Sequence, residues 1–364
     1  MGGRSERTAL VYVGTLTGDR SEGIHCYRMD PSSGALRPLE GASGVINPAF
    51  LAVDRQRRLL YAVNEVDVFE GQASGAVSAF RIEPETGVLT LINQQPSHGA
   101  GPCHLTIDPS GRFVLVANYG GGSVAVFPVQ PDGSLGEVSD VVQHRGAGVD
   151  PQRQEAPHCH SVTVGPDGRT VFVADLGLDK VMIYRLDPER GKLLAGDPPW
   201  LALHAGAGPR HMDLHPSGRY AYVVNELDST LTACVYDGAH GALEVIQTVS
   251  TLPRGFEGEN WCADIHVAPS GLHVYASNRG HDSIAIYAVD TRTGLLCFVG
   301  HEATRGRTPR NFAVSPTGLS LLVANQESHT IVAFRVDPET GHLASIGQVA
   351  EVQSPVCVKI VPVG

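Results

Sequence analysis

The sequence predicts an all-β fold, a seven-bladed β-propeller with four antiparallel strands in each blade. Three observations support this prediction: a repeat runs along the whole chain, its segments resemble short alternating strands, and the two ends of the chain complete one another. Of the 364 residues, 42 are glycine and 24 are proline, a composition that suits many short strands joined by turns. Helical periodicity is absent over any useful length.

The repeat begins with an alternating apolar strand and passes through a Pro-x-Gly turn into a second strand that ends in Asn or Asp. A third and a fourth strand follow, as in the segments PCHLTIDPSGRFVLVANYGGGSVAVFPV from Pro102 and PRHMDLHPSGRYAYVVNELDSTLTACVY from Pro209. The Asn or Asp recurs at spacings of 54, 57, 50, 53 and 47 residues, close to the length of a four-stranded propeller blade. These landmark residues are Asn64, Asn118, Asp175, Asn225, Asn278 and Asn325.

The two ends of the chain give the number of blades. The last repeat, PVCVKIV from Pro355, has no second, third or fourth strand behind it, but three strands stand at the other end as TALVYVGT, GIHCYRMD and ALRPL. We therefore expect residues 355–361 to pair with strands within about residues 8–40, which closes the ring without an open sheet edge. Residues 1–364 would then form a single domain. The seven first strands begin near Pro48, Pro102, Pro157, Pro209, Asn260, Pro309 and Pro355.

Composition and charge exclude several classes of protein. The net charge of −11 argues against nucleic acid or an anionic membrane as the main partner, and no apolar stretch approaches the ~18 residues needed to span a bilayer. Met1–Glu6 are polar and lead directly into a strand, so we expect no signal segment. The seven cysteines are scattered and contain no C-x-x-C pair, which indicates reduced thiols and a cytoplasmic protein. We expect a monomer or a weak homodimer.

Two sets of equivalent positions should surround one mouth of the central channel, because the start of a first strand lies beside the end of its antiparallel second strand. A purely structural rim would tend to repeat one residue type, whereas these positions vary. The first set is Cys103, His160, Arg210, Ala263 and Arg310, and the second is Glu65, Tyr119, Leu176, Glu226, Arg279 and Gln326. The candidate catalytic residues, on three consecutive blades, are His160, Arg210, Glu226 and Arg279. The alternative is a rim of solvated ion pairs.

A series of motifs follows one order along almost the whole chain: GPCHLTID, ANYGGGSV, PHCHSV, DLGLDKV, GPRHMDLHPSGRYAYVVNELDST, SNRGHDSI, PRNFAVSPTG and VANQES. In these motifs the sequence resembles the propeller-type 6-phosphogluconolactonases, a family that also includes the fungal carboxymuconate-lactonising enzyme. The resemblance is weakest in the first complete blade, where VDRQRR replaces the Pro-x-Gly turn. It implies a seven-bladed fold and a metal-independent site made of His160 in PHCHSV, Arg210 in GPRH, Glu226 in VNEL and Arg279 in SNRG.

The expected function is hydrolysis of 6-phosphoglucono-δ-lactone to 6-phosphogluconate, a step of the oxidative pentose phosphate pathway, with a small anionic sugar lactone as the partner. Lactone hydrolysis needs a base that activates water and a donor that stabilises the carbonyl oxyanion. Either His160 or Glu226 would be the base. Arg210 and Arg279 would stabilise the oxyanion or bind a phosphate.

Two alternatives stay open. One is a lactonase or lactonising enzyme for another substrate, an unphosphorylated sugar lactone or a carboxymuconate. The other is a non-catalytic propeller that binds a protein partner. This second alternative would need a large exposed aromatic patch at the mouth, which an aromatic content of only 6% makes hard to supply.

Five further residues are weaker candidates for substrate binding. Lys180 and Arg310 are cations suited to a phosphate, although a lysine in a turn is more often only solvated. His104 and His211 share one position of the repeat and would serve equally well as structural hydrogen-bonding groups. Glu65 belongs to the rim set that follows the landmark residues.

One pattern is compatible with a metal. His158 and His160 lie on one strand face at a spacing that a zinc site uses, with Asp264 and His266 as conceivable further ligands. Sixteen histidines make such pairs easy by chance, so we expect no metal and no cofactor. The glycines at 120–122 lack the following Lys-Ser/Thr of a phosphate loop and predict a turn.

Overall fold

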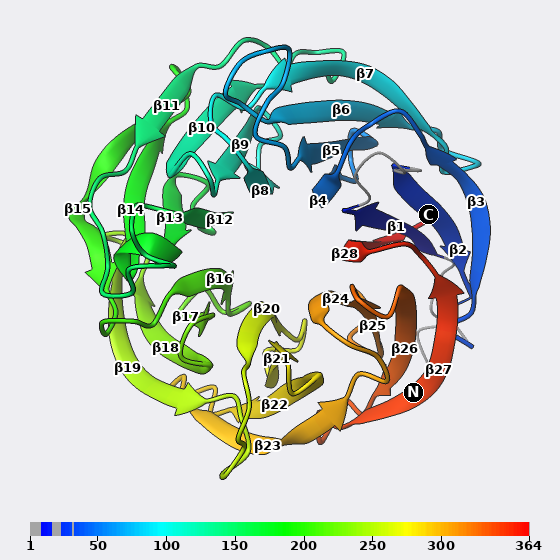
Figure 1. Cartoon of the computed structure of the whole chain (residues 1–364), viewed down its shortest axis with the longest axis vertical. Coiled ribbons are helices and arrows are strands. Elements are labelled where there is room, and N and C mark those ends of the chain that lie inside the picture. The colour runs from blue at the N-terminus through cyan, green and yellow to red at the C-terminus, as the bar shows by residue number, and fades with distance from the viewer. Residues whose placement is uncertain (1–8, 17–22, 31–32, 364) are drawn as a thin grey trace.

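The computed structural model describes residues 9–16, 23–30 and 33–363, which form seven four-stranded sheets around a central channel (Figure 1). The predicted seven-bladed β-propeller is confirmed. Each sheet is one blade, and its first strand lies innermost (Figure 1). Blades 1 to 6 follow one another from residue 48 onwards, and blade 7 closes the ring.

The strands are short and regular. Blades 1 to 3 contain β4 (Pro48–Asp54), β5 (Leu59–Asn64), β6 (Ala76–Ile82) and β7 (Leu89–Pro96); β8 (Pro102–Ile107), β9 (Phe113–Asn118), β10 (Ser123–Pro128) and β11 (Asp140–Gln143); and β12 (Cys159–Val164), β13 (Thr170–Asp175), the 3-10 turn η2 (Leu176–Leu178), β14 (Lys180–Asp187) and β15 (Lys192–Ala202). Blades 4 to 6 contain β16 (Pro209–Leu214), β17 (Tyr220–Asn225), β18 (Thr230–Asp237) and β19 (Ala242–Ser250); β20 (Trp261–Val267), β21 (His273–Arg279), β22 (Ser283–Val289) and β23 (Leu296–Ala303); and β24 (Pro309–Val314), β25 (Ser320–Asn325), β26 (Thr330–Val336) and β27 (Leu343–Glu351). No helix among the described residues has the length and apolar character to cross a membrane.

Blade 7 joins the two ends of the described chain. Its strands are β28 (Pro355–Pro362), β1 (Ala9–Thr15), β2 (Ile24–Met29) and β3 (Leu36–Ala42), in that order. β28 pairs antiparallel with β1, with Val358 opposite Val13. The sheet order is the one that the incomplete last repeat predicts. Thr8, at the start of the predicted strand, and Met1–Glu6 lie outside the described residues.

Each first strand of the described blades has a β-bulge near its start, one residue after it begins in most blades and two residues after it begins in β20. In β16, Pro209 pairs with Asn225 and His211 pairs with Val224, so Arg210 has no partner of its own. Such a bulge interrupts the alternation of the strand and redirects the side chain of the extra residue. The extra residues are Ala49, Cys103, His160, Arg210, Ala263, Arg310 and Val356. The first set of rim residues predicted from the sequence therefore consists of bulge residues.

Four landmark asparagines, Asn64, Asn118, Asn278 and Asn325, tie their blade to the segment that enters it. Asn118 is fully buried, and its Nδ2 donates a hydrogen bond to the carbonyl oxygen of Ser97 at 3.0 Å. Asn278 makes the same bond to Thr251 at 2.9 Å. Each bond joins the end of a second strand to the segment that leads into the same blade. The residue after the landmark leaves from this joined point at the channel mouth. The second rim set therefore starts from a rigid backbone.

Apolar side chains fill the interfaces between blades, and buried tyrosines add polar links across several of them. Each of these tyrosines donates its hydroxyl to a glycine carbonyl oxygen in the next blade. The bonds join Tyr12 to Gly87 at 2.8 Å, Tyr61 to Gly133 at 3.0 Å, Tyr222 to Gly294 at 3.1 Å and Tyr275 to Gly341 at 3.0 Å. The four glycines have φ between 75° and 91°, where other residues are strained. The links hold neighbouring blades in one relative orientation and so fix side chains that come from different blades.

Candidate active site

A buried carboxylate with three guanidinium partners lies at the channel mouth. Oε1 of Glu226 accepts a hydrogen bond from Nη2 of Arg153 at 2.5 Å. Oε2 accepts from Nε of Arg210 at 2.8 Å and from Nη2 of Arg279 at 2.7 Å. The Glu226 side chain is only 5% exposed. Three of the four predicted catalytic residues therefore form one hydrogen-bonded cluster.

The backbone of blades 4 and 5 holds this cluster in place. The backbone N–H of Glu226 donates to the carbonyl oxygen of Gly208 at 2.7 Å. Arg210, the bulge residue of β16, also donates to the carbonyl oxygen of Ala263 in the next blade. Arg279 donates to the carbonyl oxygen of Cys262 at 3.0 Å. Both guanidiniums are thus bound on two sides, which limits their side-chain motion.

Arg153 is a member of the cluster that the repeat pattern misses. It lies in the connection between β11 and β12, which is longer than the corresponding connections between the other blades. The buried amide of Gln154 shapes this segment, since its Oε1 accepts from the backbone N–H groups of Val149 and Asp150 at 3.1 Å. One feature of the sequence points to this longer connection. The spacing between the landmarks Asn118 and Asp175 is 57 residues, the longest between two successive landmarks.

The charges at the mouth favour an anionic ligand. Burial alone would favour the neutral acid, but the guanidiniums of Arg279, Arg210 and Arg153 outweigh it and lower the pKa of Glu226 to about 2. Burial, together with the neighbouring Arg279, lowers the pKa of Arg210 to about 9. At neutral pH the carboxylate is therefore ionised and balances one of its three arginines. The cluster keeps an excess of positive charge.

His160 lies beside the cluster as the bulge residue of β12. Its Nδ1 is 3.7 Å from Sγ of Cys103, and its ring centre is 5.3 Å from those of Tyr119 and His211. Burial, followed by the charge of Arg210, lowers the pKa of His160 well below its ordinary value. The imidazole is therefore neutral at pH 7 and offers hydrogen bonds rather than charge.

His211 connects Arg210 to the interior of the channel. Its Nδ1 donates to Oδ1 of Asp264 at 2.7 Å, so its Nε2 accepts from Nη1 of Arg210 at 3.2 Å. Oδ2 of Asp264 accepts from Nε2 of His266 at 3.1 Å. Burial opposes ionisation, but His266 and His211 hold the pKa of Asp264 well below its usual range. His104 packs against this group, 5.1 Å from the ring centre of His211, and makes no contact with Glu226.

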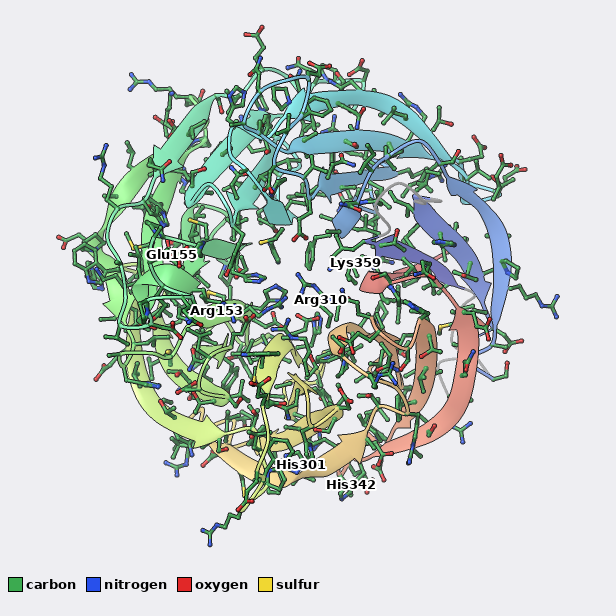
Figure 2. The ribbon with its side chains drawn as sticks, in the orientation of Figure 1. Arg153, Glu155, His301, Arg310, His342 and Lys359 are labelled. Carbon is green, nitrogen blue, oxygen red and sulfur yellow. The ribbon has the colours of Figure 1, made fainter. Side chains whose placement is uncertain are left out.

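Arg310 and Glu65 add two further charges to the mouth. Arg310 is the bulge residue of β24, and its guanidinium makes no hydrogen bond or ion pair with the described residues. In Figure 2 it lies at the central opening, and Arg153 lies on the inner side of the ring. Glu65 follows β5, is part-buried, and has Arg310 and Arg210 within electrostatic reach.

Lys180 is not brought to this site. It begins β14, the third strand of blade 3, and its Nζ lies 4.5 Å from the ring centre of the half-exposed Trp200. This cation–π contact joins β14 and β15, the two outer strands of the blade. Trp200 and Lys180 therefore stabilise each other away from the channel.

The conceivable zinc ligands are engaged with other groups. His158 interacts through Nδ1 with the carbonyl oxygen of Tyr119 at 3.0 Å and through Nε2 with Oε1 of Glu155 at 3.2 Å. Asp264 and His266 bind each other. The four residues considered as zinc ligands therefore do not converge on one point in this structure. His158, Asp264 and His266 are engaged in hydrogen bonds instead.

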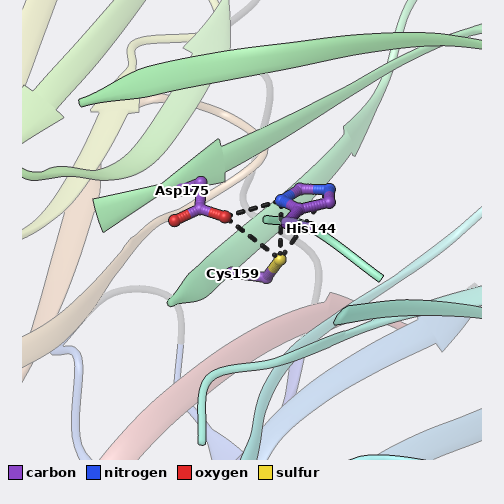
Figure 3. Close-up of side chains that lie close together, drawn as sticks. All are labelled: His144, Cys159 and Asp175. Atoms are coloured by element: carbon purple, nitrogen blue, oxygen red, sulfur yellow. Dashed lines mark hydrogen bonds and ion pairs between the residues drawn. The ribbon is translucent and has the colours of Figure 1, made fainter. Parts of the chain in front are cut away.

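A different trio, His144, Cys159 and Asp175, lies close together in blade 3 (Figure 3). Nδ1 of His144 is 2.6 Å from Oδ2 of Asp175 and 3.1 Å from Sγ of Cys159, and Nε2 accepts from the Tyr184 hydroxyl at 2.9 Å. Ligands of one tetrahedral zinc ion would be about 3.3–3.8 Å apart, given metal–ligand bonds of roughly 2.0–2.3 Å. Two of the separations are shorter than this, and Sγ of Cys159 lies 3.6 Å from Oδ2 of Asp175. In this structure the trio forms a hydrogen-bonded network at the one landmark that is Asp instead of Asn.

A cavity of about 430 Å³ occupies the channel and is lined in part by His104, His211 and His266. Its charged lining includes Arg55, Asp213, His266 and Lys359, and Nζ of Lys359 lies 4.3 Å from the ring centre of Phe50. In each first strand that lines the cavity, the lining residues follow the bulge residue along the strand. The cavity thus lies deeper in the channel than the arginine cluster, and none of the four predicted catalytic residues lines it.

Comparisons with known proteins agree with this architecture. The family model described as "Lactonase, 7-bladed beta-propeller" matches residues 10–360. The chain is 40% identical over 303 residues to a 6-phosphogluconolactonase of Bacillus subtilis (strain 168), covering 83% of this chain and 84% of the relative. Among solved structures, a periplasmic gluconolactonase of Pseudomonas aeruginosa matches with a TM-score of 0.92 and 36% identity, covering 98% of this chain and all of the other.

A structure from Bacteroides fragilis NCTC 9343, proposed to be a 6-phosphogluconolactonase, matches with a TM-score of 0.91 and 37% identity over 99% of this chain and 100% of that one. The family model and these relatives each span most of the chain. The resemblance inferred from the sequence motifs is thus confirmed, and the chain belongs to the lactonase family of seven-bladed β-propellers.

Proposed function

We propose that this lactonase hydrolyses 6-phosphoglucono-δ-lactone to 6-phosphogluconate. The observation that carries the proposal is the arginine cluster around Glu226, at the channel mouth of a protein that is 40% identical to a 6-phosphogluconolactonase. Four guanidiniums, those of Arg153, Arg210, Arg279 and Arg310, gather around two carboxylates. A phosphorylated sugar lactone is the kind of anion that such an excess of guanidinium groups binds.

The fixed arginines suit stabilisation of a developing oxyanion. Glu226 holds Arg210 and Arg279 at 2.8 and 2.7 Å, so their N–H groups need little reorganisation when the lactone carbonyl becomes tetrahedral. Preorganised donors of this kind contribute about 100- to 1000-fold to a rate. His160, neutral at pH 7, would hydrogen-bond to the substrate, and Arg310, free of protein partners in the described chain, would bind the phosphate. Glu226 would act as the group that positions the arginines.

We propose a cytoplasmic role in the oxidative pentose phosphate pathway for this reaction. The described cysteines are all free and, apart from Cys297, buried, as expected of a protein in a reducing compartment. A second candidate substrate is an unphosphorylated sugar lactone, because the chain is 36% identical to the periplasmic gluconolactonase. A monomer or weak homodimer stays a prediction.

The test compares two substrates and subtracts spontaneous hydrolysis. 6-Phosphogluconolactone is generated in situ from glucose 6-phosphate and its dehydrogenase, and its decay is followed with wild type, with Glu226→Gln and without protein. Glucono-δ-lactone is assayed in parallel. Faster decay of the phosphorylated lactone, lost in Glu226→Gln, supports the proposal. Equal or preferred hydrolysis of glucono-δ-lactone would assign the unphosphorylated substrate, and a rate equal to the background for both would reject the activity.

A further inference from the structure

Glu65 and Glu226 occupy the same position in two blades. Each directly follows the landmark asparagine that ends a second strand, Asn64 in β5 and Asn225 in β17. Blades 1 and 4 are three apart in a ring of seven, the largest separation that the ring allows. The two glutamates therefore lie on opposite sides of the channel mouth, and a substrate held by the arginines would lie between them.

The two glutamates differ in their partners. Glu226 accepts three hydrogen bonds from guanidiniums, whereas the Glu65 carboxylate has no hydrogen bond or ion pair with the described residues. Its backbone is nevertheless fixed, because its N–H donates to the carbonyl oxygen of Asn47 at 2.9 Å and its own carbonyl oxygen accepts from Nδ2 of Asn47 at 3.1 Å. The backbone that carries the side chain is thus fixed, and the carboxylate keeps its lone pairs available.

The surroundings of Glu65 also favour proton uptake. Burial raises the pKa of Glu65, and this effect outweighs Arg310 on β24 and Arg210 on β16, while Asp67 in the following loop acts in the same direction as burial. The neighbouring thiol of Cys103 on β8 stays protonated, because burial raises its pKa. Two carboxylates whose surroundings separate their pKa values in opposite directions are suited to different roles.

The other candidates are less suited to accept a proton. The pKa of Glu226 is about 2, so its carboxylate is a weak base, and both of its oxygens are already engaged. The pKa of His160 is well below its ordinary value, so an imidazolium beside Arg210 is unfavourable. Efficient general bases have a pKa closer to the working pH.

We propose that Glu65 is the general base of the lactonase reaction; this role rests on the proposed function. The Glu65 carboxylate takes a proton from water as the water oxygen bonds to the lactone carbonyl carbon. The resulting tetrahedral intermediate places its negative charge toward the guanidiniums opposite. The bond from that carbon to the ring oxygen then breaks, and the leaving oxygen takes the proton from Glu65. The new carboxylic acid releases its own proton to solvent.

The test compares the variants Glu65→Gln and Glu65→Ala with the exposed Glu70→Gln of the same loop as a control. On the lactone that wild type hydrolyses, we expect Glu65→Gln to lower kcat about 100-fold or more with little change in KM, and Glu70→Gln to match wild type. Added acetate should restore part of the rate of Glu65→Ala and none of that of Glu226→Ala. A structural role would give no such rescue.

Three outcomes are informative. Loss of kcat, loss of the acidic limb of the pH–rate profile and acetate rescue together support Glu65 as the base. A Glu65→Gln variant with a kcat near that of wild type and an unchanged pH profile overturns this role but leaves the proposed function intact. A wild-type protein that accelerates neither lactone overturns both proposals, so the two failures are distinguishable.

Discussion

Asp264 fixes the protonation pattern of His211: Oδ1 of Asp264 accepts from Nδ1 of His211 at 2.7 Å. With its proton on Nδ1, the imidazole can only accept at Nε2, where Arg210 donates at 3.2 Å. Asp264 therefore acts on the guanidinium beside Glu226 without touching it. Asp264, which lies deeper in the channel, thus positions Arg210 at the channel mouth through His211.

The substitution Asp264→Asn should weaken this positioning. An amide cannot accept from both His211 and His266, so Arg210 loses part of its orientation, and a misplacement of about 1 Å costs up to roughly 100-fold in rate. We expect kcat to fall about 10- to 100-fold with a smaller change in KM. Asp213→Asn is the matched control, because Asp213 is bound to the backbone N–H groups of Leu214 and Val267. Equal kcat losses in both variants would contradict the positioning role.

Glu226→Gln should lower both activity and stability. Removing one partner from a buried ion-pair network leaves charges uncompensated and costs about 3–5 kcal/mol of unfolding free energy. The arginines also lose their fixed geometry, so we expect kcat to fall about 100- to 1000-fold. Steady-state kinetics and urea unfolding measure the two effects. Unchanged stability would mean that water replaces the lost carboxylate.

Acid should destabilise wild type more than Glu226→Gln. The pKa of Glu226 is about 2 in the folded protein and about 4.3 in an unfolded chain, so the unfolded chain takes up its proton first as pH falls. The contribution of Glu226 is complete above about pH 4.5 and disappears as pH falls toward 2. The difference in unfolding free energy between wild type and Glu226→Gln should shrink over this range. A constant difference between pH 6 and pH 3 would argue against the low pKa.

Arg310→Ala should separate phosphorylated from unphosphorylated substrates. A charge-assisted hydrogen bond contributes about 1.5–3 kcal/mol, so KM for 6-phosphogluconolactone should rise about 10- to 100-fold, while KM for glucono-δ-lactone should stay the same. Lys180→Ala, which removes a cation packed on Trp200 outside the channel, is the control and should change neither value. An equal rise of KM for both lactones would assign Arg310 to the sugar ring.

The fold could be predicted from sequence because the repeat is visible in single residues. The landmark residues mark six repeats, the two chain ends supply the seventh blade, and the register of the repeats places Arg210 and Glu226 at one mouth before any distance is known. The pattern of the last repeat also predicts that β28 pairs with β1. These predictions follow from the order of the repeats along the chain, which the sequence displays directly.

The rest of the site depends on contacts between blades and on a segment outside the repeat. Arg153 has no equivalent position in another blade, so no alignment of repeats could place it beside Glu226. The hydrogen bond between His211 and Asp264 joins neighbouring blades. The two side chains meet because of the bulges in β16 and β20, which the spacing of residues in the sequence does not reveal. Electrostatic differences between Glu65 and Glu226 arise only once Arg279 and Arg153 are placed around one of them.

The bulges of the first strands give this propeller a simple way to change its chemistry. Each blade offers one redirected side chain to the mouth, and the strand around it keeps its pairing whatever that side chain is. Ala49, Cys103 and Ala263 are small at this position, whereas His160, Arg210 and Arg310 carry an imidazole or a guanidinium. Evolution or an engineer can therefore exchange one group per blade, and with it the preferred lactone, without redesigning the scaffold.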